Sequence, residues 1–173
     1  MAGASRHRVY FDFGMELIDL LRTFGAAMTP VGELRLSIPL AVLVLGLPWQ
    51  QALLVSVAGN LVPVLVLVPG LERLSRFLLS FPNPAGRLLA WRAESLRHAH
   101  TARFQKYQAL ALVALVAIPL PMTGAWTGSL AAWVFMVPAR RAIPLIALGV
   151  AIAGVIVTAL TMAGLTIGAA LDR

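Results

Sequence analysis

The sequence predicts an all-α integral membrane protein, built as an inverted repeat in which a re-entrant helical hairpin precedes a transmembrane helix in each half. Composition is the first observation: 60% of the 173 residues are hydrophobic and 12% are charged, whereas a soluble domain has about 25% charged residues. The second is that the runs 36–71, 107–139 and 142–171 contain no charged residue, and each could cross the bilayer as a helix. The third is a weak internal repeat.

The net charge of +7 is concentrated in two stretches. Residues 72–106 contain seven basic and two acidic side chains, Arg140 and Arg141 add two further positive charges, and the rest of the chain balances. Short cytoplasmic loops are rich in Lys and Arg, so both stretches should face the cytoplasm. A basic run can also bind nucleic acid, but this one is tethered between membrane helices and no nucleic-acid-binding motif accompanies it. We therefore expect no nucleic-acid partner.

If both basic stretches lie on one side, the run 107–139 must enter the membrane and return. Its middle, IPLPMTGAWTGS, should break a helix. Pro119 and Pro121 each remove a backbone donor, and Gly124 and Gly128 permit unusual backbone conformations. Non-helical backbone at membrane depth survives only when it is buried in protein or lines a wet cavity. We therefore expect 107–137 to form a re-entrant hairpin and 142–170 to span the membrane.

The first third of the chain predicts the same order of elements. Residues 15–28 have the apolar periodicity of an amphipathic helix. The segment TPVGELRLSIP follows, where Pro30 and Pro39 predict a second break, and an apolar return leads to Pro48. Residues 49–70 then form a span whose one amide side chain is Asn60.

A shift of 90 residues relates the two halves. It aligns Pro48 with Pro138 and Gly59 with Gly149. One true crossing in each half is an odd number, so the halves should have opposite orientations, an architecture found in transporters. Both termini should then be outside. The chain is expected to be one membrane domain, which consists of repeat 1 at 14–69, a basic connector at 70–106 and repeat 2 at 107–172.

The connector should consist of amphipathic helices on the cytoplasmic surface, against anionic membrane lipid. Leu71, Leu74 and Leu78 form an apolar stripe among basic residues. His98 and His100 are expected to be surface residues rather than metal ligands. The chain contains no cysteine, which excludes disulfides and thiolate metal sites.

Two opposite charges, Glu33 and Arg35, precede the charge-free run that begins at residue 36. In irregular backbone such residues point the same way. Thr29 resembles a helix N-cap before Pro30, and Thr123 or Thr127 could cap the corresponding helix in the second half. Half-helix N-termini beside Arg35 would attract anions.

The candidate substrate-binding or ion-binding residues are therefore Glu33, Arg35, Asn60, Thr123 and Thr127. A structural alternative stays open for all five. Glu33 and Arg35 could be an ion pair that holds a hairpin or groups that reach the interface. The amide and the hydroxyls could bridge helices.

Four segments resemble the small multidrug export protein family over most of residues 30–160. They are ELRLSIPLAVLVLGLP, AGNLVPV, IPLPMTGAWTGSL and RRAIPLIALGVAIAGVIV. The family usually reads E-L-R-G-A-I-P in the first motif, where this chain has Leu36 and Ser37, and the PLP-x-TG-x-WTG motif is specific. The chain is also distantly similar to the DedA/VTT membrane proteins, which implies paired re-entrant loops and movement of phospholipid-type molecules.

Together with the broken helices, the resemblance favours a secondary transporter in a prokaryotic plasma membrane that exports drugs or small molecules. A cationic drug would need Glu33 as the binding and proton-coupling carboxylate. One alternative is a flippase or scramblase of a phosphate-bearing lipid, which would use Arg35. Another is a non-transporting membrane scaffold or biogenesis factor. We expect neither an enzyme nor a cofactor, because the broken loops contain no nucleophile–base set, nucleotide loop or metal cluster. A homo-oligomer is left open.

We predict that residues 72–106 and 140–141 are cytoplasmic and that both termini are outside. Because the chain lacks cysteine, Ala90→Cys and Asp172→Cys each introduce a single thiol. An impermeant thiol reagent added to intact cells should label position 172, and position 90 should react only after permeabilisation. Labelling of both positions from the same side would refute the inverted repeat.

Overall fold

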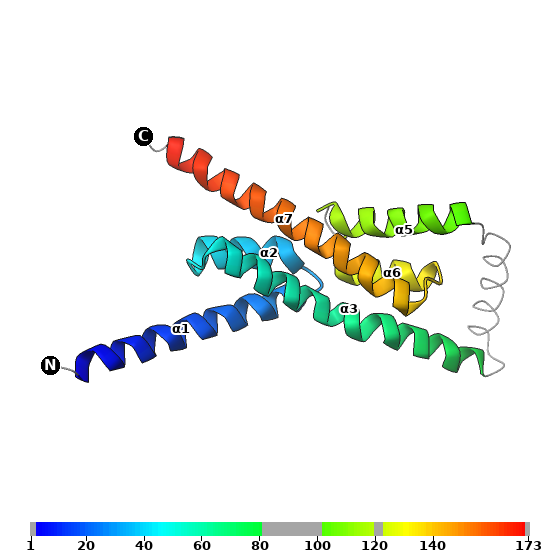
Figure 1. The fold of residues 1–173 in the computed structure, drawn as a ribbon, viewed down its shortest axis with the longest axis horizontal. Coiled ribbons are helices and arrows are strands. Elements are labelled where there is room, and N and C mark those ends of the chain that lie inside the picture. Colours follow the sequence, from blue (N-terminus) through cyan, green and yellow to red (C-terminus); the bar gives the residue numbers. More distant parts are fainter. Residues whose placement is uncertain (1–2, 81–101, 120–122, 172–173) are drawn as a thin grey trace. The chain divides into compact units, whose positions relative to one another are not determined.

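The computed structural model describes the backbone of residues 3–80, 102–119 and 123–171, and the side chains of 16–80, 107–119 and 123–167. Regular structure in these ranges is helical (Figure 1). The elements are α1 (Gly3–Met28), α2 (Glu33–Pro39), the π-helix η1 (Leu40–Val44), α3 (Trp49–Leu79), α5 (Ala102–Ala117), α6 (Ala125–Val134) and α7 (Ala139–Leu171). The predicted all-α class is confirmed for the described residues.

Within the described ranges, two helices are long and apolar enough to cross a membrane. They are α3, over Trp49–Leu79, and α7, over Ala139–Ile167. They include the spans predicted at 49–70 and over most of 142–170, and both continue beyond the expected ends. A helix rises about 1.5 Å per residue, so each is longer than the hydrocarbon core of about 30 Å. If either helix crosses the bilayer, its ends would extend into the interfacial regions.

The chain folds as two compact units. Unit 1 comprises residues 1–60 and 154–173, and unit 2 comprises residues 61–153. Unit 1 therefore holds α1, α2, η1 and the first part of α3, together with the last part of α7. Unit 2 holds the rest of α3, α5, α6 and the first part of α7.

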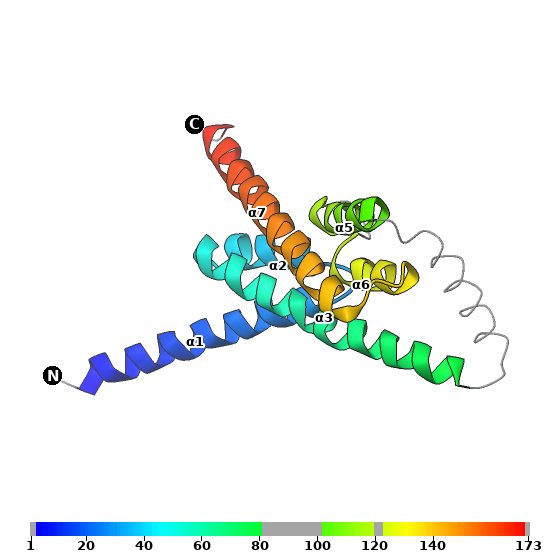
Figure 2. The same cartoon turned by 45° about the vertical axis from the view of Figure 1, so that its right-hand side comes forward.

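Glycine brings the helices of unit 1 together. Helix α1 contacts α2 and η1 (Figure 2). A Cβ added at Gly59 of α3 would lie 2.5 Å from the carbonyl oxygen of Phe24 in α1. A Cβ at Gly154 of α7 would lie 2.8 Å from Cδ1 of Leu53 in α3. Small residues allow this close approach. In lipid the hydrophobic effect does not drive helices together, so close van der Waals packing becomes a main source of attraction between them.

Unit 2 uses the same kind of contact around one valine. Helices α5 and α6 contact each other, and Val116 of α5 is buried. A Cβ at Gly149 of α7 would lie 2.7 Å from Cβ of Val116, and one at Gly128 of α6 would collide with the Val116 side chain. Val116 therefore fills the space that these two glycines leave open.

Local features recur in the two halves at the offset of 90 that the sequence predicts. Gly59 and Gly149 both sit at a close helix contact. The amides of Ala52 and Ala142 donate to the carbonyls of Pro48 and Pro138, both at 3.0 Å. Residues 52–60 and 142–150 also have the same order of buried, half-buried and exposed positions.

A left-handed turn residue occurs at the same point of each half. Gly46 has φ +68° and Met136, 90 residues later, has φ +55°. Both positions precede a long helix, α3 or α7. Glycine adopts this conformation without steric cost. In Met136 the Cβ atom lies too close to a backbone carbonyl oxygen, so the backbone is strained.

The first break differs from the predicted one. The chain leaves helical structure at 29–32, but α2 runs through Pro39 and passes directly into η1. Pro39 was expected to break the helix, and that expectation is wrong. A proline removes one helical hydrogen bond, and the helix widens after it, where the amide of Leu45 donates to the carbonyl of Leu40 at 3.0 Å. Single π turns of this kind occur inside α-helices, often at functional sites.

The second break confirms that residues 107–137 are not one continuous helix. Helix α5 ends at Ala117 and α6 begins at Ala125. Pro119 lies in the break and Gly124 is the N-cap of α6, whereas Pro121 is outside the described residues. Gly128 was also predicted to break the helix, and that is wrong. It is a buried residue inside α6, where it is needed for contact with Val116.

The connector also begins later than predicted. Helix α3 continues to Leu79, so Leu71, Leu74 and Leu78 belong to the end of the long helix and not to a separate surface helix. Residues 81–101, which include His98 and His100, lie outside the described residues. The connector's predicted surface position stays a prediction.

The glycine contacts predict opposite effects of the same substitution within one helix. Gly59→Ala should lower the free energy of unfolding by about 1–3 kcal/mol, because the new methyl group meets the backbone of α1. Gly70→Ala, in the same helix but with nothing within 4 Å of the added Cβ, should be stabilising by about 0.5–1 kcal/mol. Thermal unfolding in detergent, followed by circular dichroism, measures both. Equal stability of the two variants would contradict the close contact.

The second half supplies an independent matched pair. Gly149→Ala should be destabilising, and Gly164→Ala should not be, because nothing lies within 4 Å of a Cβ at Gly164. The two pairs should behave alike if the contacts in the two halves are equivalent.

Candidate functional site

Glu33 is the first residue of α2 and is strained. Its φ is +46°, in the left-handed region that a glutamate rarely adopts, and it is buried, with 8% of its surface exposed. Arg35 is half-buried in the same turn. The sequence predicted irregular backbone for both residues; Glu33 has it, whereas Arg35 lies inside α2. The strain is therefore concentrated at one residue, and such strain is common at functional sites.

The predicted N-caps are wrong in both halves. The N-cap of α2 is Gly32 and that of α6 is Gly124, and neither has a side-chain cap hydrogen bond. The Thr29 hydroxyl donates to the carbonyl of Ala26 at 2.7 Å. The Thr123 hydroxyl donates to the carbonyl of Ile118 at 2.9 Å. Both hydroxyls thus bond backwards along the chain, a common alternative to capping.

Unit 1 contains three buried polar side chains without a hydrogen-bond partner. Ser37 and Ser56 are fully buried and Asn60 is 1% exposed. Among the described atoms nothing pairs with either serine Oγ or with Oδ1 and Nδ2 of Asn60. Leaving a buried polar group unpaired costs about 1–3 kcal/mol. Ser56 and Asn60 are four residues apart on α3 and so share one face.

Other buried hydroxyls of the described residues satisfy themselves. Thr23, Ser129 and Thr158 donate to the carbonyl four residues earlier at 2.7–2.8 Å. This bond to the preceding turn is available to any serine or threonine in a helix. Ser37 and Ser56 do not make it, and Asn60 both donates and accepts hydrogen bonds. The three side chains can therefore hold water or a polar ligand.

The structure brings some of the predicted site residues into one unit. Glu33, Arg35 and Asn60 belong to unit 1, whereas Thr123 and Thr127 belong to unit 2, Thr127 within α6. The predicted approach of 29–39 to 119–129 stays a prediction. Sequence reasoning missed Ser37 and Ser56. Ser56 could have been found, because it precedes Asn60 by one helical turn in a charge-free run.

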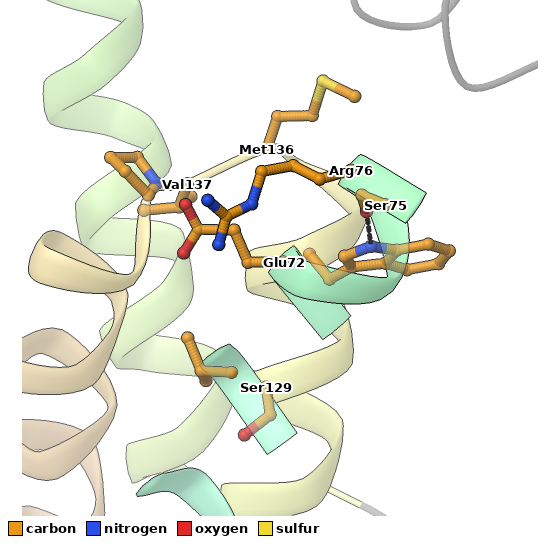
Figure 3. Close-up of a pocket in the computed structure, with 9 residues that line it drawn as sticks. Glu72, Ser75, Arg76, Ser129, Met136 and Val137 are labelled. Atoms are coloured by element: carbon orange, nitrogen blue, oxygen red, sulfur yellow. Dashed lines mark hydrogen bonds between the residues drawn. The ribbon is translucent and has the colours of Figure 1, made fainter. Parts of the chain in front are cut away.

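Unit 2 contains a pocket of about 210 Å³ at the end of α3 (Figure 3). Helix α3 lines it with Val68, Glu72, Ser75 and Arg76. Helix α6 and the turn after it complete the wall with Ser129, Trp133, Met136, Val137 and Pro138. The Trp133 indole N–H donates to the Ser75 hydroxyl and ties the two sides together. The sequence did not predict this pocket, since its lining comes from segments some 60 residues apart.

The described acidic and histidine side chains form no group of three that could hold a metal ion. The first turn of α2 instead carries the charged residues Glu33 and Arg35. The pocket of unit 2 carries Glu72 and Arg76. Unit 1 therefore contains both buried uncharged polar atoms and a strained, buried carboxylate, and unit 2 contains a charged pocket.

Comparison with known protein families gives a match over most of the chain. The family model described as Putative small multi-drug export protein matches residues 33–156. The matched region starts at Glu33 and includes the second break and most of α7. No curated protein and no solved structure matches the chain.

Two fully buried serines provide a test of the unpaired polar groups. Ser56→Ala should leave the stability unchanged or raise it, because no hydrogen bond is lost. Ser129→Ala should lower the free energy of unfolding by about 0.5–1.5 kcal/mol, because its hydroxyl donates to Ala125. Thermal unfolding of both variants in detergent measures the difference. An equal loss in Ser56→Ala would mean that the Ser56 hydroxyl is hydrogen-bonded, for example to water.

Proposed function

The chain belongs to the small multi-drug export protein family, and from this premise we propose that it is a proton-linked secondary exporter of small molecules. The family and the two long apolar helices make it an integral membrane protein. In the proposal, the substrate site is formed near the bilayer midplane by the broken helices of both halves. Glu33, Arg35, Asn60, Thr123 and Thr127 are the binding residues proposed for it.

The unpaired polar groups of unit 1 carry the proposal. Polar side chains inside a membrane are costly, and ionisable ones usually face a substrate or ion pathway. Asn60, Ser37 and Ser56 keep hydrogen-bonding atoms buried without a described partner, and Glu33 is buried at a strained break in the same unit. Groups held this way could bind water or substrate, which supports a polar site in unit 1.

The geometry of unit 2 supports the proposed inverted repeat. The end of α3 and the turn that leads into α7 line the same pocket. The C-terminal end of α3 therefore lies near the N-terminal end of α7. The two basic stretches, which begin at Glu72 and at Arg140, therefore start at the same end of this unit. Two long helices that cross in opposite directions, each after a broken helix, are the arrangement of inverted-repeat transporters.

Glu33 is proposed as the coupling carboxylate. It is the one acidic residue between Asp19 and Glu72, so any proton carried by a carboxylate in that stretch must be carried there. A cationic substrate and a proton would compete for Glu33, which links export of one to import of the other. Arg35 would bind an anionic group instead. The relative influence of these two side chains would therefore decide whether the substrate is a cation or an anion.

We expect Glu33→Gln to abolish uptake driven by a pH gradient in liposomes while exchange of substrate across the membrane persists. The amide keeps the shape of the side chain but cannot carry a proton. Arg35→Gln should abolish movement of an anionic substrate and spare that of a cation. Glu16→Gln, which removes an exposed carboxylate of the same unit, should behave like the unchanged protein. Uptake of a cationic dye and movement of a fluorescent phospholipid are measured in the same vesicles.

The double variant separates function from structure. If Glu33 and Arg35 only hold the fold, each single change should cost about 3–5 kcal/mol and the double change should recover much of it. If they bind substrate, the double variant should fold and fail to transport. Normal transport by the double variant would return both residues to a structural role. If the protein moves the lipid but does not take up the dye, a flippase is favoured. If the unchanged protein shows neither activity, a scaffold is favoured.

A further inference from the structure

The pocket of unit 2 carries opposite charges at one end and is closed at the other. Glu72 and Arg76 are exposed and lie one helical turn apart on α3. Figure 3 shows both charged groups beside Val137, and Ser129 at the opposite end of the pocket. Ser129 and Val68 are buried. A ligand would thus meet the charges at the mouth and apolar surface with one hydroxyl inside.

The walls of the pocket are held in place. The hydrogen bond from Trp133 to Ser75 joins α6 to α3, and Gln108 of α5 donates to the carbonyl of Phe135 at 2.7 Å. The second bond fixes the turn that carries Met136 and Val137 into the pocket. No ion pair within the described side chains joins Glu72 to Arg76. Both charges are therefore available to a ligand.

The sequence places this pocket at the headgroup level of the membrane. Glu72 is the first charge after the charge-free run 36–71, and Arg140 and Arg141 begin two residues after Pro138 of the pocket wall. The basic side chains around both segments favour the cytoplasmic interface. Tryptophan is enriched at that level, and Trp133 lines the pocket there.

We propose that this pocket binds the zwitterionic headgroup of an ethanolamine phospholipid, with the phosphate on Arg76 and the ammonium on Glu72. Arg recognises phosphate through paired N–H donors. The carboxylate of Glu72 accepts hydrogen bonds from a primary ammonium, which lies only two methylene groups away from the phosphate oxygen. Side chains one turn apart are neighbours on a helix, so one headgroup can reach both.

The size and the charge of the pocket select this headgroup over the other lipids. A pocket of about 210 Å³ can hold a small headgroup, while the acyl chains would stay in the bilayer. An anionic headgroup would pair with Arg76 but would be repelled by Glu72. A choline headgroup has no N–H to donate to Glu72. The site is separate from the proposed export site and does not depend on it.

The test measures lipid binding to the purified, delipidated full chain in detergent by native mass spectrometry. Short-chain phosphatidylethanolamine should bind more tightly than phosphatidylcholine or phosphatidylglycerol. Arg76→Gln should weaken its binding about tenfold to a hundredfold, the size expected for charge-assisted hydrogen bonds. Arg73→Gln, an exposed neighbour that does not line the pocket, should bind like the unchanged protein. Glu72→Gln should remove the preference for ethanolamine over glycerol.

A competition experiment with soluble glycerophosphoethanolamine shows whether the pocket binds the membrane lipid or the free headgroup compound. The lipid should bind well at concentrations where the soluble compound does not compete, because the acyl chains hold the headgroup at the interface. Competition at equal concentration would overturn the lipid assignment. Equal binding of the three lipids, or equal affinity of Arg76→Gln and Arg73→Gln, would overturn the site. The three substituted side chains are exposed, so elution of the variants as the native species on size exclusion establishes folding.

Discussion

Close approach of helices through glycine is the constraint on which the described structure depends. Inside a bilayer, burial of apolar surface does not drive helices together, and packing must replace it. Gly59 lets α3 approach the backbone of α1, and Gly149 lets α7 approach α5. Phe24 lies near the end of α1, and Val116 lies near the end of α5. These contacts therefore lie close to the points where the two helices end.

The proline-containing segments of the two halves satisfy backbone groups in different ways. Lipid offers no hydrogen bonds to backbone groups. In the first half the helix widens into η1 after Pro39 and continues, and in the second the Thr123 hydroxyl donates across the break to Ile118. Three side chains of unit 1 differ, because their polar atoms are buried and have no partner among the described residues. They are Ser37, Ser56 and Asn60. That contrast makes unit 1 the place to seek bound water or substrate.

The sequence predicted the long-range order of the elements better than their local chemistry. Charge-free runs are a direct consequence of the lipid environment, so α3 and α7 could be located from composition. The offset of 90 followed from Pro48 with Pro138 and Gly59 with Gly149 and recurs in the backbone. Pro39 and Gly128 misled, because a proline can be absorbed by a wider helical turn, and a glycine can serve packing rather than a break.

Side-chain partners could not be predicted from spacing alone. Thr29 has the sequence position of an N-cap but bonds to Ala26 behind it, a choice that depends on the path of the chain after α1. The pocket of unit 2 was hidden for a related reason. Ser75 and Trp133 meet only once α3 and α6 are packed together, and no periodicity of the sequence relates them.

The unequal turns at Gly46 and Met136 give the two halves different local energies at equivalent positions. Glycine reaches a left-handed φ at the expense of chain entropy on folding, whereas methionine retains steric strain in the folded turn. If the halves exchange roles during export, the two end states are not mirror images in free energy. The strained turn would then bias the resting population toward one access state, and the chain would need no ligand to have a preferred starting direction.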